Sequence, residues 1–104
     1  MVDRPFVVRV GVRSTHSDFP GDLRMVLVPL TQAHLGITQV QVFAKRNDYR
    51  VFVVITWESE EKYRTARVDG TWEKEIVPLL QQYDGTIFVV TETNEILPGW
   101  AEVT

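Results

Sequence analysis

Hydrophobic and polar residues alternate over residues 6–13, which predicts a β-strand with one apolar face and one mixed face. Residues 37–45, 50–57 and 86–92 are also rich in β-branched and aromatic side chains and predict three more strands. The run over 50–57 is apolar on both faces, so we expect it to be central and covered on both sides. Asn47 and Asp48 supply the turn that precedes it.

A first helix is predicted between the first two strands, after a polar loop over 14–21. Asp22 is the predicted N-cap, and Gly36 is the residue just past the C-terminal end. Pro29 lies inside this pattern and should kink or split the helix. In an alternative interpretation, residues 24–28 are extended and a short helix starts at Pro29; we favour the kinked helix. The apolar face recurs at helical spacing through Leu23, Val26, Leu27, Leu30 and His34.

A second helix is predicted directly after the third strand. Ser59 is a suitable N-cap, and the carboxylates of Glu60 and Glu61 suit the positive end of a helix. The helix should break at Asp69–Gly70 and meet a second irregularity at Pro78. After the break it resumes with one apolar stripe, made of Trp72, Ile76, Leu79, Leu80 and Tyr83.

The predicted order β-α-β-β-α-β is that of the ferredoxin-like α+β fold, a four-stranded antiparallel sheet with helices on one face. We expect a single domain over residues 1–104. The open face of the sheet needs a cover, and a second subunit is the simplest one. The tail over residues 93–104 is apolar for a terminus, with Ile96, Leu97 and Trp100, so we expect it to pack on the partner of a homodimer.

Composition excludes several classes of function. The chain of 104 residues has no cysteine, which rules out disulfides, thiolate nucleophiles and cysteine-based metal sites. Its net charge of −3 argues against a nucleic-acid partner. Asp3 and Arg4 interrupt any signal-like apolar segment, and no apolar run approaches the roughly 20 residues of a membrane helix. A cytoplasmic protein with no membrane contact is therefore expected.

The most informative stretch is residues 51–64, VFVVITWESEEKYR, in which a strand ends at Trp57 and a capped helix follows. With residues 77–80, VPLL, it resembles the antibiotic biosynthesis monooxygenase-like superfamily of dimeric α+β barrels. That resemblance implies a homodimer whose two sheets form a barrel, with a pocket between the sheet and helices of each subunit. It also implies oxygenation of an aromatic substrate with no metal or flavin, in which Trp57 helps to hold oxygen-bearing intermediates.

Other residues of the resembled family are replaced in this chain. Val53 stands where such oxygenases carry an asparagine, and Lys74 or Val77 stands near the place of a helix arginine. The haem-degrading branch uses a first-strand asparagine and a histidine on the second helix, which this chain lacks, so no haem or other cofactor is expected. A mutarotase-like branch has a comparable Glu-Ser-Glu-Glu-aromatic stretch and matches in part.

Three residues are catalytic candidates, each with a simpler alternative. Trp57 is either a hydrogen-bond donor in a pocket or a core aromatic residue. His34 could transfer a proton near neutral pH, or it could simply suit the negative end of its helix. Arg9 is a charge within a core strand, so it needs an anionic ligand, a salt bridge or water. Tyr63, Trp72 and Val53 are the predicted pocket lining, and no residue set is spaced to bind a metal.

Two functions follow from these candidates. The first is a cofactor-independent enzyme for a hydrophobic aromatic or polyketide-like molecule, with His34 moving a proton and Arg9 stabilising an enolate or phenolate. The alternative is a non-catalytic dimeric ligand-binding or assembly protein of the same fold, or a mutarotase- or isomerase-like member. An enzyme should place His34 or Arg9 on a pocket wall with Trp57. A protein that has lost the chemistry should fill that space with side chains.

Overall fold

The computed structural model describes residues 4–95 and 97–104. Its sheet has the strand order β4-β1-β3-β2-β5, and every neighbouring pair is antiparallel. The first four strands have the order of the ferredoxin-like fold, which confirms the predicted α+β class. The prediction of four strands is wrong, because the C-terminal tail adds a fifth at the edge beside β2. The strands are β1 (Phe6–Arg13), β2 (Ile37–Ala44), β3 (Arg50–Trp57), β4 (Thr86–Thr91) and β5 (Ala101–Glu102).

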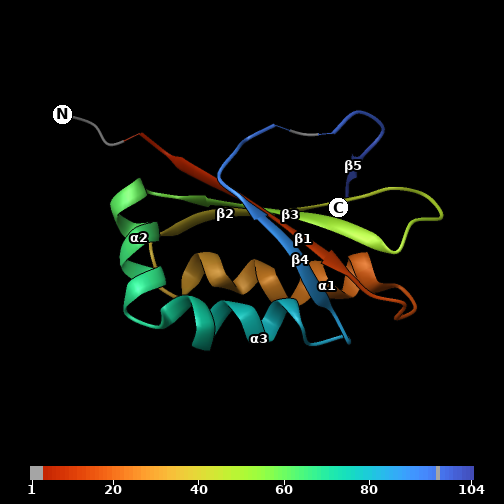
Figure 1. The fold of residues 1–104 in the computed structure, drawn as a ribbon, viewed down its shortest axis with the longest axis horizontal. Coiled ribbons are helices and arrows are strands. Elements are labelled where there is room, and N and C mark those ends of the chain that lie inside the picture. Colours follow the sequence, from red (N-terminus) through yellow and green to blue (C-terminus); the bar gives the residue numbers. More distant parts are fainter. Residues whose placement is uncertain (1–3, 96) are drawn as a thin grey trace.

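All helices cover one face of this sheet (Figure 1). They are α1 (Phe19–Leu27), which continues as a 3₁₀ helix over Val28–Gln32, then α2 (Glu60–Val68), a π-helical turn over Trp72–Ile76, and α3 (Val77–Leu80). None of these helices is long and apolar enough to cross a membrane, within the described part of the chain.

The first helix begins earlier than predicted. Helix α1 starts at Phe19, so Asp22 lies inside its first turn and the prediction of Asp22 as N-cap is wrong. Pro20 fits the first turn because helical N–H groups there have no intrahelical partner. At Pro29 the missing N–H interrupts the α-helical hydrogen bonds and the chain tightens into the 3₁₀ helix, which confirms the predicted irregularity.

The second helix follows the prediction closely. The Ser59 hydroxyl accepts a hydrogen bond from the backbone N–H of Lys62, which confirms the cap. The helix breaks at Gly70, whose positive φ of 89° suits glycine. The π-helical turn comes directly before α3, where Pro78 cannot donate to a carbonyl of the preceding turn.

The core lies between the sheet and the helices. Val8, Val10 and Val12 of β1 pair with Ile55, Val53 and Val51 of β3, and all six side chains are fully buried. Directly paired residues share one face and successive residues of a strand alternate between faces, so Trp57 and Val53 point toward the helices, whereas Arg9 points to the opposite face.

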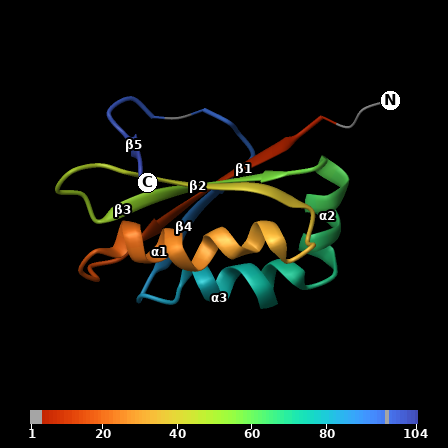
Figure 2. The same ribbon diagram turned by 180° about the vertical axis from the view of Figure 1, so that it is seen from behind.

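The opposite face of the sheet is partly covered by the chain's own tail (Figures 1 and 2). Strand β5 pairs with the end of β2, and the Trp100 ring lies 4.9 Å from the Phe52 ring, edge to face. Leu97 remains 39% exposed, and Ile96 lies outside the described residues. The tail therefore packs on its own sheet in a single chain, and the predicted contact with a partner stays a prediction.

Candidate functional site

Trp57 is the last residue of β3 and is fully buried on the helix side of the sheet. Its indole N–H has no hydrogen-bond acceptor among the described residues. A buried donor without a partner costs about 1–3 kcal/mol, and native proteins keep few of them. This unpaired N–H is the feature of the helix-side core that ordinary packing does not explain.

Trp57 belongs to a group of four aromatic residues that we call the aromatic cluster: Phe6, Trp57, Tyr63 and Trp72. Tyr63, on the inward face of α2, lies at the centre. Its ring centroid is 5.4 Å from that of Phe6, 5.5 Å from that of Trp57 and 5.9 Å from that of Trp72. Tyr63 and Trp72 are 2% and 3% exposed, so side chains fill the space around Trp57.

Two arginines of α2 cover the outer side of the aromatic cluster. The Arg67 guanidinium carbon lies 4.9 Å from the Trp72 ring centroid and 5.7 Å from that of Tyr63, and its Nη1 donates to the Tyr63 hydroxyl at 2.7 Å. The Arg64 guanidinium lies 5.5 Å from the Phe6 ring and 5.4 Å from the Tyr63 ring. Both cations are thus held over aromatic faces, where the ring quadrupole attracts them.

An open groove of about 520 Å³ runs beside these arginines, between α2 and the edge strand β4. We call it the α2–β4 groove. Its volume is within the range of small-molecule sites. Tyr63 belongs both to the aromatic cluster and to the wall of this groove, so its ring is the contact between the two. The lining residues are Tyr63, Arg64, Arg67, Val90, Thr91 and Glu92.

The charges along the α2–β4 groove are not all compensated. Arg64 forms ion pairs with Glu60, at 3.2 Å, and with Glu92. The hydrogen bond from Arg64 lowers the pKa of the Glu92 carboxyl, so Glu92 stays ionised at neutral pH. Arg67 forms no ion pair with any carboxylate of the described residues. Arg64 is thus shared by two carboxylates, whereas Arg67, whose charge also lowers the pKa of Glu92, forms no ion pair among the described residues.

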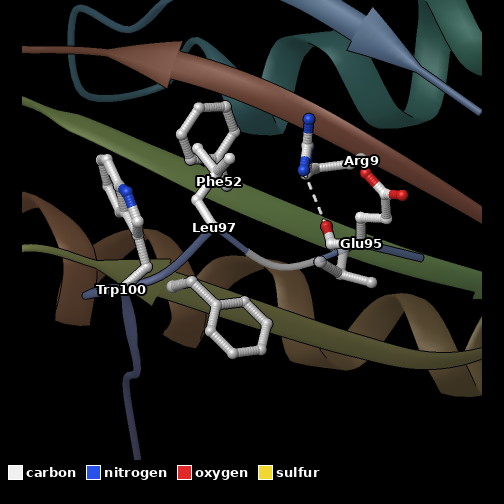
Figure 3. Close-up of a pocket in the computed structure, with 7 residues that line it drawn as sticks. Arg9, Phe52, Glu95, Leu97 and Trp100 are labelled. Carbon is white, nitrogen blue, oxygen red and sulfur yellow. Dashed lines mark hydrogen bonds between the residues drawn. The ribbon is translucent and has the colours of Figure 1, made fainter. Parts of the chain in front are cut away.

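Arg9 lies on the other side of the sheet, under the tail (Figure 3). Its Nη1 donates to the Glu95 carbonyl at 2.7 Å, and its guanidinium lies 5.2 Å from the Phe52 ring centroid. Its Nε is buried and has no partner among the described residues. The adjoining space, between the sheet and Leu97 and Trp100, is about 10 Å³, which is roughly the room that one water needs.

His34 lies at the far end of the first helical segment, exposed and with a positive φ of 57°. It lines a separate space of about 200 Å³ with residues of α2, among them Lys62 and Ala66. Neither Trp57 nor Arg9 lines that space. The structure therefore does not bring His34, Arg9 and Trp57 together in one pocket.

The predicted pocket residues are placed as follows. Tyr63 and Trp72 lie in the aromatic cluster with Trp57, as a shared pocket requires. Val53 is fully buried in the centre of the sheet and lines none of the three spaces described above.

Sequence reasoning missed Arg67. The signal was its position four residues after Tyr63, since side chains at that spacing meet on one helix face.

A metal site is not apparent in the part of the chain that the structure describes: no three histidine, aspartate or glutamate side chains are grouped to hold an ion. The candidate site is a cluster of aromatic rings with a buried N–H that has no acceptor among the described residues, bordered by a groove that contains Arg64, Arg67 and Glu92.

Two solved structures are similar to this chain. A proposed antibiotic biosynthesis monooxygenase from Deinococcus radiodurans is 18% identical, with 88% of this chain and 95% of that chain covered and a TM-score of 0.48. A dimeric ferredoxin-like protein from an uncultured marine organism is 14% identical, with 88% and 86% covered and a TM-score of 0.41. No protein-family model and no curated protein matches the sequence.

Proposed function

We propose that this protein binds a small hydrophobic aromatic molecule at the aromatic cluster. The observation that carries the proposal is the buried indole N–H of Trp57, which has no acceptor among the described residues. A ligand with an acceptor oxygen would satisfy this donor and stack against the surrounding rings. Tyr63 would have to turn aside to admit it, because Tyr63 separates the α2–β4 groove from Trp57.

The placement of the other candidates favours binding over catalysis. His34 and Arg9 each line a space that Trp57 does not reach, and aromatic side chains fill the surroundings of Trp57. This is the arrangement expected of a ligand-binding protein that lacks the chemistry of the family it resembles. Cofactor-independent oxygenation is the second candidate, because the same unpaired N–H could hold an oxygen-bearing intermediate.

We also propose that the protein is a homodimer joined through the tail-side face of the sheet. Phe88, at the bulge of β4, lies 5.9 Å from Phe52 on this face and is 42% exposed. Leu97 of the tail, 39% exposed, lines a small space with Phe52 on the same face. A second copy of the face would remove these apolar side chains from water.

Calorimetric titration with 2-naphthol tests the binding proposal, because this neutral probe has an aromatic ring and one acceptor oxygen. The wild-type protein should bind it, and Trp57→Phe should weaken binding by about threefold to tenfold, as expected for the loss of one neutral hydrogen bond. Trp100→Phe is the matched control, since Trp100 lies on the opposite face of the sheet. The proposal fails if wild type does not bind 2-naphthol, or if Trp57→Phe binds it unchanged.

A further inference from the structure

We propose that the ligand carries a carboxylate or a similar planar oxyanion, and that Arg67 binds this group in the α2–β4 groove. This inference rests on the proposed function and assigns a charge to its ligand. Arg67 would be a specificity-determining residue, with the aromatic part of the ligand directed toward Tyr63 and Trp57.

Arg67 is already held in position for such a contact. Its guanidinium carbon lies 4.9 Å from the Trp72 ring centroid, a contact that does not involve Tyr63, and its hydrogen bond to the Tyr63 hydroxyl uses one of five N–H donors. A guanidinium fixed in this way loses little side-chain freedom when it binds, and its planar fork matches a carboxylate with two parallel hydrogen bonds.

The charge balance of the groove singles out Arg67 rather than its neighbour. Arg64 is paired with both Glu60 and Glu92, whose two negative charges exceed its one positive charge, whereas Arg67 forms no ion pair within residues 4–95 and 97–104. Glu92 would repel a dianion that came close to it. A single negative charge placed at Arg67 therefore fits the groove better than a highly charged ligand.

The shape of the groove agrees with an aromatic ligand that has an anionic end. Val90 of the edge strand, 37% exposed, gives the groove an apolar wall opposite α2, and Thr91 adds a hydroxyl. The Tyr63 ring lies between Arg67 and Trp57, so a bicyclic ligand that displaced it would place one end near each residue.

Arg9, whose buried Nε has no partner among the described residues, is a weaker candidate for the same role. The tail leaves only about 10 Å³ beside it, and the Glu95 carbonyl already accepts from its guanidinium. The α2–β4 groove has a volume of about 520 Å³ and is lined by Arg67, which forms no ion pair among the described residues. An anionic aromatic molecule therefore fits on the helix side of the sheet.

The test compares 1-naphthoate with 1-naphthamide, which has the same shape and no charge, by calorimetric titration at neutral pH. Wild type should bind naphthoate about tenfold more tightly than naphthamide, as expected for a charge-assisted pair of hydrogen bonds. Arg67→Gln should remove this preference by weakening naphthoate alone. Arg46→Gln, which removes the same charge in the turn between β2 and β3 and does not line the groove, should leave both affinities unchanged.

If wild type binds the two probes with equal affinity, the proposal that the ligand is anionic is contradicted, while the proposed binding function is not. An Arg67→Gln variant that keeps the preference for naphthoate, or an Arg46→Gln variant that loses it, would also overturn the role of Arg67. If neither probe binds wild type, the proposed function fails and this inference with it. Should Arg67→Gln not fold, Arg67→Lys keeps the charge but not the fork and should bind naphthoate more weakly than wild type does.

Discussion

Trp57 combines complete burial with an indole N–H that has no acceptor in residues 4–95 and 97–104, a costly arrangement in a protein of 104 residues. Cores normally pair such donors with a backbone carbonyl or a water. The Tyr63 hydroxyl of the same cluster is bonded to Arg67 and not to Trp57. We therefore interpret the N–H of Trp57 as held for a ligand.

Replacing Trp57 by Phe should change the free energy of unfolding by less than about 1.5 kcal/mol, as for volume-conserving exchanges. Part of the packing is lost, but an unpaired buried donor is removed at the same time, and the two effects oppose each other. Urea denaturation of the variant and of wild type measures the difference. A loss of about 3 kcal/mol or more would mean that this N–H is paired in the native protein, as in an ordinary core.

The sequence predicted the positions of some site residues but not which of them lie on the same face of the sheet. The strand ending at Trp57 and the inward direction of Tyr63 and Trp72 follow from local periodicity, and the structure confirms them. The separation of Arg9 from Trp57 depends on the β1–β3 register, in which Val8 lies opposite Ile55. Register is a property of two strands, so the pattern of either strand alone could not reveal it.

At the scale of elements, strands were predicted better than helix ends. The bounds of β1 and β3 match the predicted runs, because alternation marks β1 and a continuous β-branched and aromatic run marks β3. The start of α1 was missed, because its N-cap position, Asp18, adopts a left-handed backbone and makes no side-chain cap. Strand β5 was missed because a pair of residues, Ala101 and Glu102, carries no periodic signal.

Replacing Gly85 and Gly21 by alanine should change the stability of the fold in opposite directions. Gly85 precedes β4, and a Cβ there would collide with the Leu80 carbonyl oxygen and lie 2.9 Å from a Val12 methyl. Gly85→Ala should destabilise the fold by about 1–3 kcal/mol, because the backbone carbonyl of Leu80 cannot move away from the new methyl group as a flexible side chain could. Gly21→Ala, in α1 with open space around it, should stabilise by about 0.5–1 kcal/mol.

Thermal or urea denaturation of the two glycine variants checks this contrast. If Gly85→Ala were neutral, the turn between α3 and β4 would be looser than the structure has it. A destabilised Gly21→Ala would indicate that α1 does not extend to its first turn, where Gly21 lies.

At the scale of the molecule, the order of elements was enough to predict the ferredoxin-like sheet, because this connectivity has few antiparallel solutions. The position of the tail was not predictable in the same way. Its apolar residues favour burial, and either the sheet of the same chain or the sheet of a partner subunit could bury them. In the single chain, Trp100 packs on Phe52 of its own sheet.

Light scattering at micromolar concentration should give twice the chain mass of 12.0 kDa. Removing residues 95–104 takes Leu97 and Trp100 away from Phe43 and Phe52, so it should weaken the dimer and expose apolar surface. A monomer mass for the full chain would contradict the homodimer. A truncated chain that keeps an unchanged dimer would show that the tail is no part of the interface.

The central claim, that a ligand pairs with the N–H of Trp57, is tested most directly by the indole resonances in a ¹H–¹⁵N correlation spectrum. The chain has three tryptophans, and the Trp57 signal is identified by its absence in Trp57→Phe. On saturation with 2-naphthol, the Trp57 resonance should move downfield, as for an N–H that gains an acceptor, while that of Trp100 stays in place. A bound probe that leaves the Trp57 resonance unmoved would contradict the account.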